Sequence, residues 1–241
     1  MKAIAFIPAR YAATRFPGKL MEILGDKTVI RHTYENTKNT LLFDEVIVVT
    51  DSEIIFNEIV HHGGYAIMSK QPHESGSDRI AEAVADIDVD IVVNVQGDEP
   101  FVKKELLEDL LSVFKNDLNG EIKVASLMCQ IEDQQMITNP NQVKVVVDKN
   151  NDALLFSRSM IPFHRDKNIL PLYYKHIGIY AFRKNVLMNF TKWNPTPLET
   201  IEKLEQLRYL ENGVKIKMVL TNESPVSIDI PEDLEFARKY I

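Results

Sequence analysis

The chain has 241 residues, of which 45% are hydrophobic and 26% charged, and its formal net charge is −7. This acidic balance argues against a nucleic-acid-binding protein, because such proteins carry a basic surface. No apolar run reaches membrane-spanning length, and the first residues resemble a strand rather than a signal peptide. We therefore expect a cytoplasmic protein with no membrane insertion, and a core large enough for independent folding.

A basic loop follows the first expected strand. Residues 3–7 are almost continuously apolar, which is typical of a strand buried on both faces of a parallel sheet. The loop after it contains Arg10, Arg15 and Lys19 among small residues. Ligands of open α/β sheets bind beyond the carboxyl ends of the strands, and these cations suit phosphate oxygens. The spacing matches neither a Walker loop nor a dinucleotide fingerprint, so a plain basic surface loop is the alternative.

Helices and strands alternate over the following residues. We expect a helix at 28–40, a strand at 45–50, a helix capped by Asp51-Ser52 and a strand at 65–68. The second helix has an apolar stripe that should face the core, made of Ile54, Ile55, Ile59 and Val60. The alternation predicts right-handed parallel crossovers.

Two polar segments follow, each next to a predicted regular element. Residues 72–79 lead into a helix expected at 80–85, which Ser75 or Ser77 could cap. The buried strand at 91–95 runs into Asp98, beside a second carboxylate, Glu99. We favour a magnesium ligand at Asp98, with Glu99 as a competing carboxylate, because this segment would face the same sheet edge as the basic loop and Mg²⁺ is usually held by one or two carboxylates together with substrate phosphates. The alternative is a plain strand-to-helix turn capped by Asp98.

The second half departs from simple alternation. A helix is expected at 103–114 and strands are expected at 123–130, 142–148, 153–156, 173–183 and 215–221. The turn at 149–152 predicts an antiparallel hairpin. The single cysteine, Cys129, excludes an internal disulfide and is expected in the core. In the strand at 173–183, His176 and Tyr180 should lie on the same face. Their role is either structural or to form one wall of a carbohydrate-binding site.

Two helices complete the expected elements. The first is a charged helix at 198–211, with apolar positions at Ile201, Leu204, Leu207 and Leu210. The second begins near Pro231, with acidic residues in its first turn. Asp229, just before it, could be only the cap of that helix.

Several sequence blocks resemble the sugar nucleotidyltransferases, and most closely the 3-deoxy-manno-octulosonate (Kdo) cytidylyltransferase family. They come in the family's order along nearly the whole chain and are IPARYAATRFPGK, HESGSDR, VNVQGDEPF, FSRSMIPF, KHIGIYAFR, PLETIEKLEQLR and DIPEDLE. Two positions differ mildly from the family, since Ser77 replaces a usual Thr and Ile230 a usual Thr after Asp229.

The resemblance implies an α/β fold of the Rossmann-like nucleotide-diphospho-sugar transferase type. The expected sheet is mixed and mostly parallel, with helices on both faces and an antiparallel extension in the second half. Residues 1–241 would form a single nucleotidyltransferase domain, in which roughly 140–195 form the extension and a homodimer contact. The implied activity is the Mg²⁺-dependent transfer of the cytidylyl group of CTP to Kdo, which gives CMP-Kdo and pyrophosphate for lipopolysaccharide biosynthesis.

The resemblance also assigns roles to single residues. Catalysis is assigned to Asp98, Lys19 and Arg15, and Mg²⁺ binding to Asp98 and Asp229. CTP contacts are assigned to Arg10, Arg15, Lys19, Ser77, Arg79 and Gln96. Sugar contacts are assigned to Gln96, Arg158, His176, Tyr180, Glu205 and Gln206. The sequence singles out no dedicated general base.

Three other functions remain open from the sequence. The acceptor could be an 8-amino analogue of Kdo or a sialic acid, although the blocks KHIGIYAFR and LEQLR favour Kdo over sialic acid. The chain could be a glycosyltransferase, but Asp98-Glu99-Pro100 lacks the DxD motif frequent in that class. It could also be an inactive nucleotide sensor, against which the presence of both Asp98 and Asp229 argues.

Overall fold

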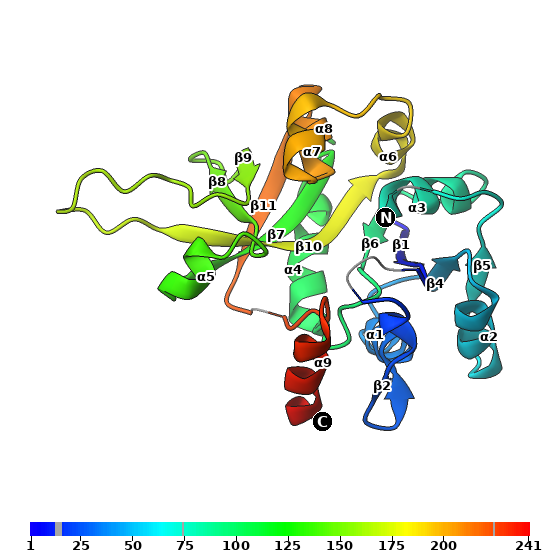
Figure 1. Ribbon diagram of the computed structural model, residues 1–241. Helices are drawn as coiled ribbons and strands as arrows, with labels where there is room; N and C mark the ends of the chain where they lie inside the picture. Colours follow the sequence, from blue (N-terminus) through cyan, green and yellow to red (C-terminus); the bar gives the residue numbers. More distant parts are fainter. Residues whose placement is uncertain (13–15, 74, 224) are drawn as a thin grey trace. The chain divides into compact units, whose positions relative to one another are not determined.

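The computed structural model describes residues 1–12, 16–73, 75–223 and 225–241. The chain divides into two compact units. Unit 1 comprises Met1–Glu108, Arg183–Thr191 and Pro225–Ile241, and unit 2 comprises Asp109–Phe182 and Lys192–Ser224. The division into compact units does not test whether residues 1–241 form a single nucleotidyltransferase domain, so that expectation stays a prediction. Figure 1 labels the elements.

Unit 1 contains a parallel sheet with the strand order β6-β1-β4-β5. Its strands are β1 (Ala3–Ala9), β4 (Glu45–Thr50), β5 (Ala66–Met68) and β6 (Ile91–Asn94). Strand β1 is almost fully buried, as its apolar run predicts. The alternating pattern of helices and strands is therefore confirmed as a set of parallel crossovers.

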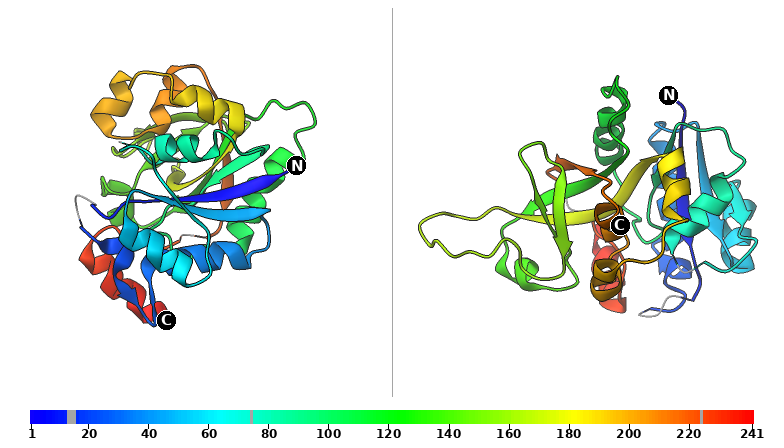
Figure 2. Two further views of the ribbon diagram at one scale, coloured as in Figure 1. Left: turned by 90° about the vertical axis from the view of Figure 1, so that its right-hand side faces the viewer. Right: turned by 90° about the horizontal axis from the view of Figure 1, so that it is seen from above.

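The helices of unit 1 cover both faces of this sheet. In Figures 1 and 2, α3 (Gly76–Val84) lies on the opposite side of the strands from α1 (Val29–Asn39) and α2 (Glu53–His61). The remaining elements are η1 (Lys19–Met21), the hairpin strands β2 (Ile23–Leu24) and β3 (Lys27–Thr28), α6 (Lys184–Phe190), α9 (Pro231–Ala237) and η2 (Arg238–Tyr240). Helix α4 (Lys104–Lys115) spans the point where the two units divide.

The predicted core stripe of α2 is half wrong. Ile55 and Ile59, which are four residues apart, are 0% and 1% exposed, whereas Ile54 and Val60 are 54% and 41% exposed. Residues four apart lie on the same face of a helix, while their immediate neighbours point about 100° away. The helix packs through a stripe too narrow to bury all four residues.

Unit 2 supplies the antiparallel extension. Its strands are β7 (Val124–Ile131), β8 (Lys144–Val147), β9 (Ala153–Ser157), β10 (Tyr173–Arg183) and β11 (Ile216–Thr221). Strand β10 pairs antiparallel with β7 and β8, the hairpin β8–β9 forms as predicted, and β11 pairs parallel with β7. Cys129 is buried in β7. The mixed sheet expected from the sequence is thus confirmed.

The single helix predicted at 198–211 is wrong. Unit 2 has α5 (Gln134–Thr138) and then two short helices, α7 (Pro197–Glu202) and α8 (Gln206–Glu211). Lys203 ends α7 in the left-handed region, at φ 55°, so the helix cannot continue through it. The expected apolar position Ile201 is correspondingly 77% exposed, while Leu204 and Leu207 are buried.

Candidate active site

The basic loop leaves β1 and folds back on itself within unit 1. The amide of Gly18 donates to the carbonyl of Tyr11 at 2.9 Å, and Gly18 has a φ of 75° that favours glycine. This closure places Lys19 at the start of η1, while Arg10 is exposed directly after β1. Arg15 lies outside the described residues, and its predicted contact with CTP stays a prediction.

Lys19 lies between two carboxylates that are far away in the sequence. Its ammonium group donates a hydrogen bond to Asp98 and a second one, of 3.1 Å, to Asp229. The partners are 79 and 210 residues away along the chain. The structure therefore brings together three residues that the sequence assigned to phosphate and metal binding. The pairing itself was not foreseen.

Asp98 is positioned by close packing at the carboxyl edge of the parallel strands. Strands β1 and β6 run parallel, so the segments following both lie at this edge. A Cβ added to Gly97 would lie 3.2 Å from the carbonyl oxygen of Pro8 and equally close to side chains of Leu20 and Ile30. Helix α4 begins only at Lys104, so the alternative of Asp98 as its cap is wrong.

Asp229 is held beside Asp98 by main-chain contacts. The amide of Ile228 donates to the carbonyl of Asp98 at 2.9 Å. The Asp233 carboxylate accepts hydrogen bonds from the amides of Asp229 and Ile230, and Ile230 is the N-cap of α9. Asp229 is therefore not the helix cap, and its carboxylate contacts Lys19 instead. That alternative from the sequence is wrong.

The charge of Lys19 is stabilised by its surroundings. Burial by itself lowers the pKa of an ammonium group, but Asp98 and then Asp229 outweigh this effect, so the net pKa of Lys19 is raised. Lys19 therefore remains a cation at neutral pH. One ammonium shared by two carboxylates leaves this cluster with a net negative charge.

The helix α3 forms a second segment next to the first loop. Ser75 caps it by accepting from the amide of Asp78, and a Cβ added to Gly76 would lie 3.2 Å from the ring of Pro8. Capping by Ser75 is confirmed, and the helix begins earlier than the predicted residue 80. Ser77 is buried in its first turn.

Arg79 joins two strand ends rather than facing solvent. It is only 3% exposed, and its guanidinium donates to Asp51 at 2.7 Å and to Ser69 at 2.9 Å. Gln96 donates to Asn94 at 3.0 Å. The CTP contacts assigned to Ser77, Arg79 and Gln96 stay predictions, and Arg79 would have to exchange partners to reach a nucleotide.

Unit 2 brings His176 and Tyr180 together, as their shared strand face predicts. Their ring centroids lie 5.3 Å apart, and His176 Nε2 lies 2.9 Å from the Ser126 hydroxyl. Burial, with a smaller effect of Lys175, lowers the pKa of His176 to about 3, so the ring is neutral at pH 7. Burial and the nearby Glu205 raise the pKa of the Tyr180 phenol. These rings can accept or donate hydrogen bonds but carry no charge.

Arg158 is engaged by the end of α7. Its guanidinium donates to the carbonyls of Glu202 at 2.8 Å and Pro140 at 3.0 Å, while the Glu202 carboxylate accepts from the Arg158 amide and the Ser157 hydroxyl. Gln206 begins α8 and is buried. The sugar contacts assigned to unit 2 stay predictions.

The acidic pair fits a divalent cation. Among the described residues, no cluster of three or more His, Cys, Asp or Glu side chains is placed to hold a metal. Mg²⁺ commonly takes one or two carboxylates and completes its coordination with substrate phosphates and water. Asp98 and Asp229 already converge on one cation, the Lys19 ammonium, which is the arrangement that such a site requires.

The fold and this site define a nucleotide-binding α/β protein, with a cationic loop and two converging carboxylates at the carboxyl edge of parallel strands. A family model described as cytidylyltransferase matches residues 4–216. The 3-deoxy-manno-octulosonate cytidylyltransferase of Flavobacterium johnsoniae is 62% identical over 99% of this chain and 98% of its own. The protein of the same name from Christiangramia forsetii is 58% identical over 100% and 97%.

Solved structures agree with this assignment. A structure of CMP:2-keto-3-deoxy-manno-octonic acid synthetase complexed with CTP is 37% identical and has a TM-score of 0.93, covering 100% of this chain and 98% of that one. A 4-diphosphocytidyl-2C-methyl-D-erythritol synthase from Anaerococcus prevotii, 17% identical with a TM-score of 0.64 over 99% and 97%, shares the fold. The chain belongs to the cytidylyltransferase family, in the group of the 3-deoxy-manno-octulosonate cytidylyltransferases.

Sequence reasoning missed the residues that hold the site residues in place. Asp51 and Ser69 position Arg79, and Glu202 positions Arg158. A carboxylate directly after the strand 45–50 was a usable signal for Asp51, but it was assigned only to capping. The other contacts had no local signal.

Proposed function

We propose that this chain transfers the cytidylyl group of CTP to the anomeric hydroxyl of Kdo, giving CMP-Kdo and pyrophosphate. The observation that supports it most directly is the convergence of Lys19, Asp98 and Asp229 at one point of unit 1. The two relatives at 62% and 58% identity, and the CTP complex named above, agree with this chemistry.

The reaction requires positioning and charge neutralisation more than covalent chemistry. The anomeric oxygen of the sugar forms a bond to the α-phosphorus, the bond to the bridging oxygen breaks, and pyrophosphate leaves. We assign the triphosphate contacts to Arg10, Arg15 and Lys19, whose positive charges offset the charge that develops on the leaving group.

We propose that Asp98 and Asp229 hold Mg²⁺. When bound, this ion would lower the pKa of the attacking hydroxyl and screen it from the phosphate charge. The Lys19 ammonium now satisfies both carboxylates, so metal loading would release it from at least one of them. Lys19 would then be free to contact a phosphate oxygen. The sugar would be contacted by Gln96, Arg158, His176, Tyr180, Glu205 and Gln206.

We also propose a homodimer that uses the segment between β9 and β10. This segment projects from unit 2 in Figure 1, and several of its apolar side chains are exposed. Phe163, Ile169 and Leu170 are 80%, 65% and 89% exposed. Exposed apolar groups that gather in one segment are typical of an interface. Light scattering tests the homodimer by comparing the wild-type chain with a variant that carries Phe163→Ser and Leu170→Ser. A monomeric wild type would contradict the homodimer.

A cytoplasmic location is part of the same proposal. Among the described residues, no helix is long and apolar enough to cross a membrane. Fractionation of cells that produce the chain would test the location, and recovery from a compartment other than the cytoplasm would contradict it.

The function itself is tested by pyrophosphate release. The chain is supplied with Mg²⁺ or EDTA, with CTP or another nucleoside triphosphate, and with Kdo, its 8-amino analogue or a sialic acid. Release that requires Mg²⁺, CTP and Kdo supports the proposal, whereas preference for the amino analogue or for sialic acid reassigns the acceptor. Absence of release with every pair contradicts cytidylyl transfer.

A further inference from the structure

Helix α1 carries polar side chains on the face that it packs against the rest of unit 1. The Thr33 side chain is fully buried, and its hydroxyl lies 2.9 Å from the carbonyl oxygen of Gly97 and 3.2 Å from that of Val29 in its own helix. One turn further on, Asn36 donates from Nδ2 to the carbonyl of Pro100 at 2.6 Å. Two side chains of one helix thus bind main-chain groups on either side of Asp98.

The main chain around Asp98 is held at three of the four residues 97–100. Gly97 and Pro100 accept hydrogen bonds from α1, while the carbonyl of Asp98 itself accepts from the amide of Ile228. Because Gly97 is also packed tightly against Pro8, the segment has little space in which to move. These contacts fix the main chain from which the Asp98 side chain projects.

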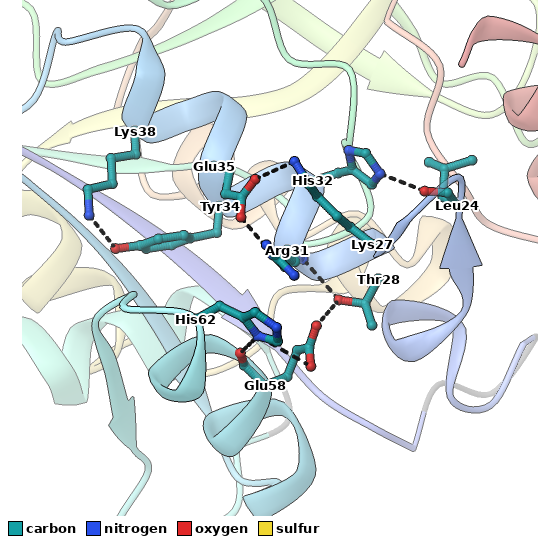
Figure 3. A network of polar contacts seen from close by, with 10 residues as sticks. All are labelled: Leu24, Lys27, Thr28, Arg31, His32, Tyr34, Glu35, Lys38, Glu58 and His62. Atoms are coloured by element: carbon teal, nitrogen blue, oxygen red, sulfur yellow. Dashed lines mark hydrogen bonds and ion pairs between the residues drawn. The ribbon is translucent and has the colours of Figure 1, made fainter.

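The helix that provides these contacts is itself anchored on its other side. Thr28, its N-cap, donates to Glu58 of α2 at 2.9 Å, as the dashed line in Figure 3 indicates. Glu35 accepts from Lys27 at 2.8 Å and from Arg31 at 2.6 Å, and the ring of His32 lies 2.6 Å from the carbonyl of Leu24. These contacts tie α1 to the β2–β3 hairpin and to α2, so it can act as a fixed support.

We propose that Thr33 and Asn36 are positioning residues that aim the Asp98 carboxylate for metal binding and cytidylyl transfer. They contact the carbonyls of Gly97 and Pro100 and act through the main chain of residues 97–100. The inference rests on the proposed function of Asp98 and extends it to a second layer of residues. Such supporting contacts commonly change metal affinity or activity by about 10- to 100-fold when removed.

The helix offers a matched control at Thr37. Thr37 is also fully buried, on the same helix, and its hydroxyl donates at 2.7 Å to the carbonyl of Thr33 within that helix. Thr33→Val and Thr37→Val make the same change of shape and polarity, but only Thr33→Val removes a contact with Gly97. Thr33→Ser keeps the hydroxyl and should therefore keep the contact with Gly97. Asn36→Ala removes the contact with Pro100 and serves if Thr33→Val does not fold.

The first measurement is Mn²⁺ affinity in the presence of CTP and without sugar, by electron paramagnetic resonance. We expect Thr33→Val to weaken Mn²⁺ binding by about tenfold, at the lower end of effects of this kind. The Mg²⁺ concentration for half-maximal rate should rise by a similar factor, with KM for CTP at saturating Mg²⁺ changed less than twofold. Thr33→Ser and Thr37→Val should resemble the wild type in both respects.

The second measurement needs no turnover. Hydrogen exchange at the Ile228 amide, which is bound to the Asp98 carbonyl, should be about tenfold faster in Thr33→Val than in Thr37→Val. Equal Mn²⁺ affinity and equal exchange in these two variants would overturn the positioning role, even if the wild type is an active cytidylyltransferase. An inactive wild type whose variants differ as expected would instead contradict the proposed function and leave the positioning role intact.

Discussion

Substitution of Asp98 by asparagine separates the chemistry of the site from its contribution to folding. Asp98→Asn keeps the size of the side chain and removes one negative charge. The Asp98 and Lys19 side chains are 20% and 12% exposed, so the pair is partly buried. After the substitution, Lys19 still has the Asp229 carboxylate at 3.1 Å, and the new amide oxygen can still accept a hydrogen bond.

The magnitudes expected for stability and for activity differ widely. A hydrogen bond to a charged group contributes about 1.5–3 kcal/mol and a neutral one about 1 kcal/mol, so the free energy of unfolding should fall by only about 0.5–2 kcal/mol. We assign Asp98 to Mg²⁺, which would offset negative charge in the transition state, and loss of one such electrostatic contribution costs about 100- to 1,000-fold in kcat. We therefore expect a folded protein with at most about 1% of the wild-type kcat.

The assay pairs pyrophosphate release at saturating CTP and Kdo with urea unfolding of the same samples. Asp26→Asn is the matched control, because Asp26 is exposed in unit 1 and the net charge changes equally. A kcat close to that of the wild type in Asp98→Asn would refute the assignment of Asp98. A similar loss in Asp26→Asn would show that net charge, and not a ligand, is responsible.

Three further predictions concern other parts of the chain. Arg15→Ala should raise KM for CTP by about tenfold or more and leave KM for Kdo nearly unchanged, because the lost cation is assigned to the triphosphate; steady-state kinetics in both substrates would show the reverse pattern if the loop binds the sugar. The pKa of His176 is about 3 in the folded chain and about 6.5 when unfolded, so the unfolded state binds the extra proton and stability is lost as pH falls below about 6.5. Urea unfolding at pH 7 and pH 4 should show a loss of up to about 3 kcal/mol from this group, and His176→Gln should reduce the difference between the two pH values by that amount. Glu199→Gln breaks the buried two-point ion pair with Arg208 and should lower the free energy of unfolding by about 3 kcal/mol, so a change below about 1 kcal/mol would show that the pair is dispensable.

The parts of the fold that follow from local patterns were predicted well. The apolar run of β1, the hairpin turn at 149–152 and the strand 173–183 are all signalled by residues within a few positions of each other. The break at Lys203 was not predicted, because the residues 198–211 have a continuous helical pattern. The contacts of Glu202 with Ser157 and Arg158, more than 40 residues away, accompany that break and are not part of the pattern.

The family, the order and kind of most elements, and the residues chemically suited to bind phosphate and metal can all be read from the amino-acid sequence. The folded chain is needed to see that Lys19, Asp98 and Asp229 meet, that Arg79 is held by Asp51, and that α1 contacts the Asp98 segment. These contacts join residues that are far apart along the chain. Periodicity and capping act over a few residues, whereas these contacts form only when parallel strands bring the segments that follow them to one edge of the sheet.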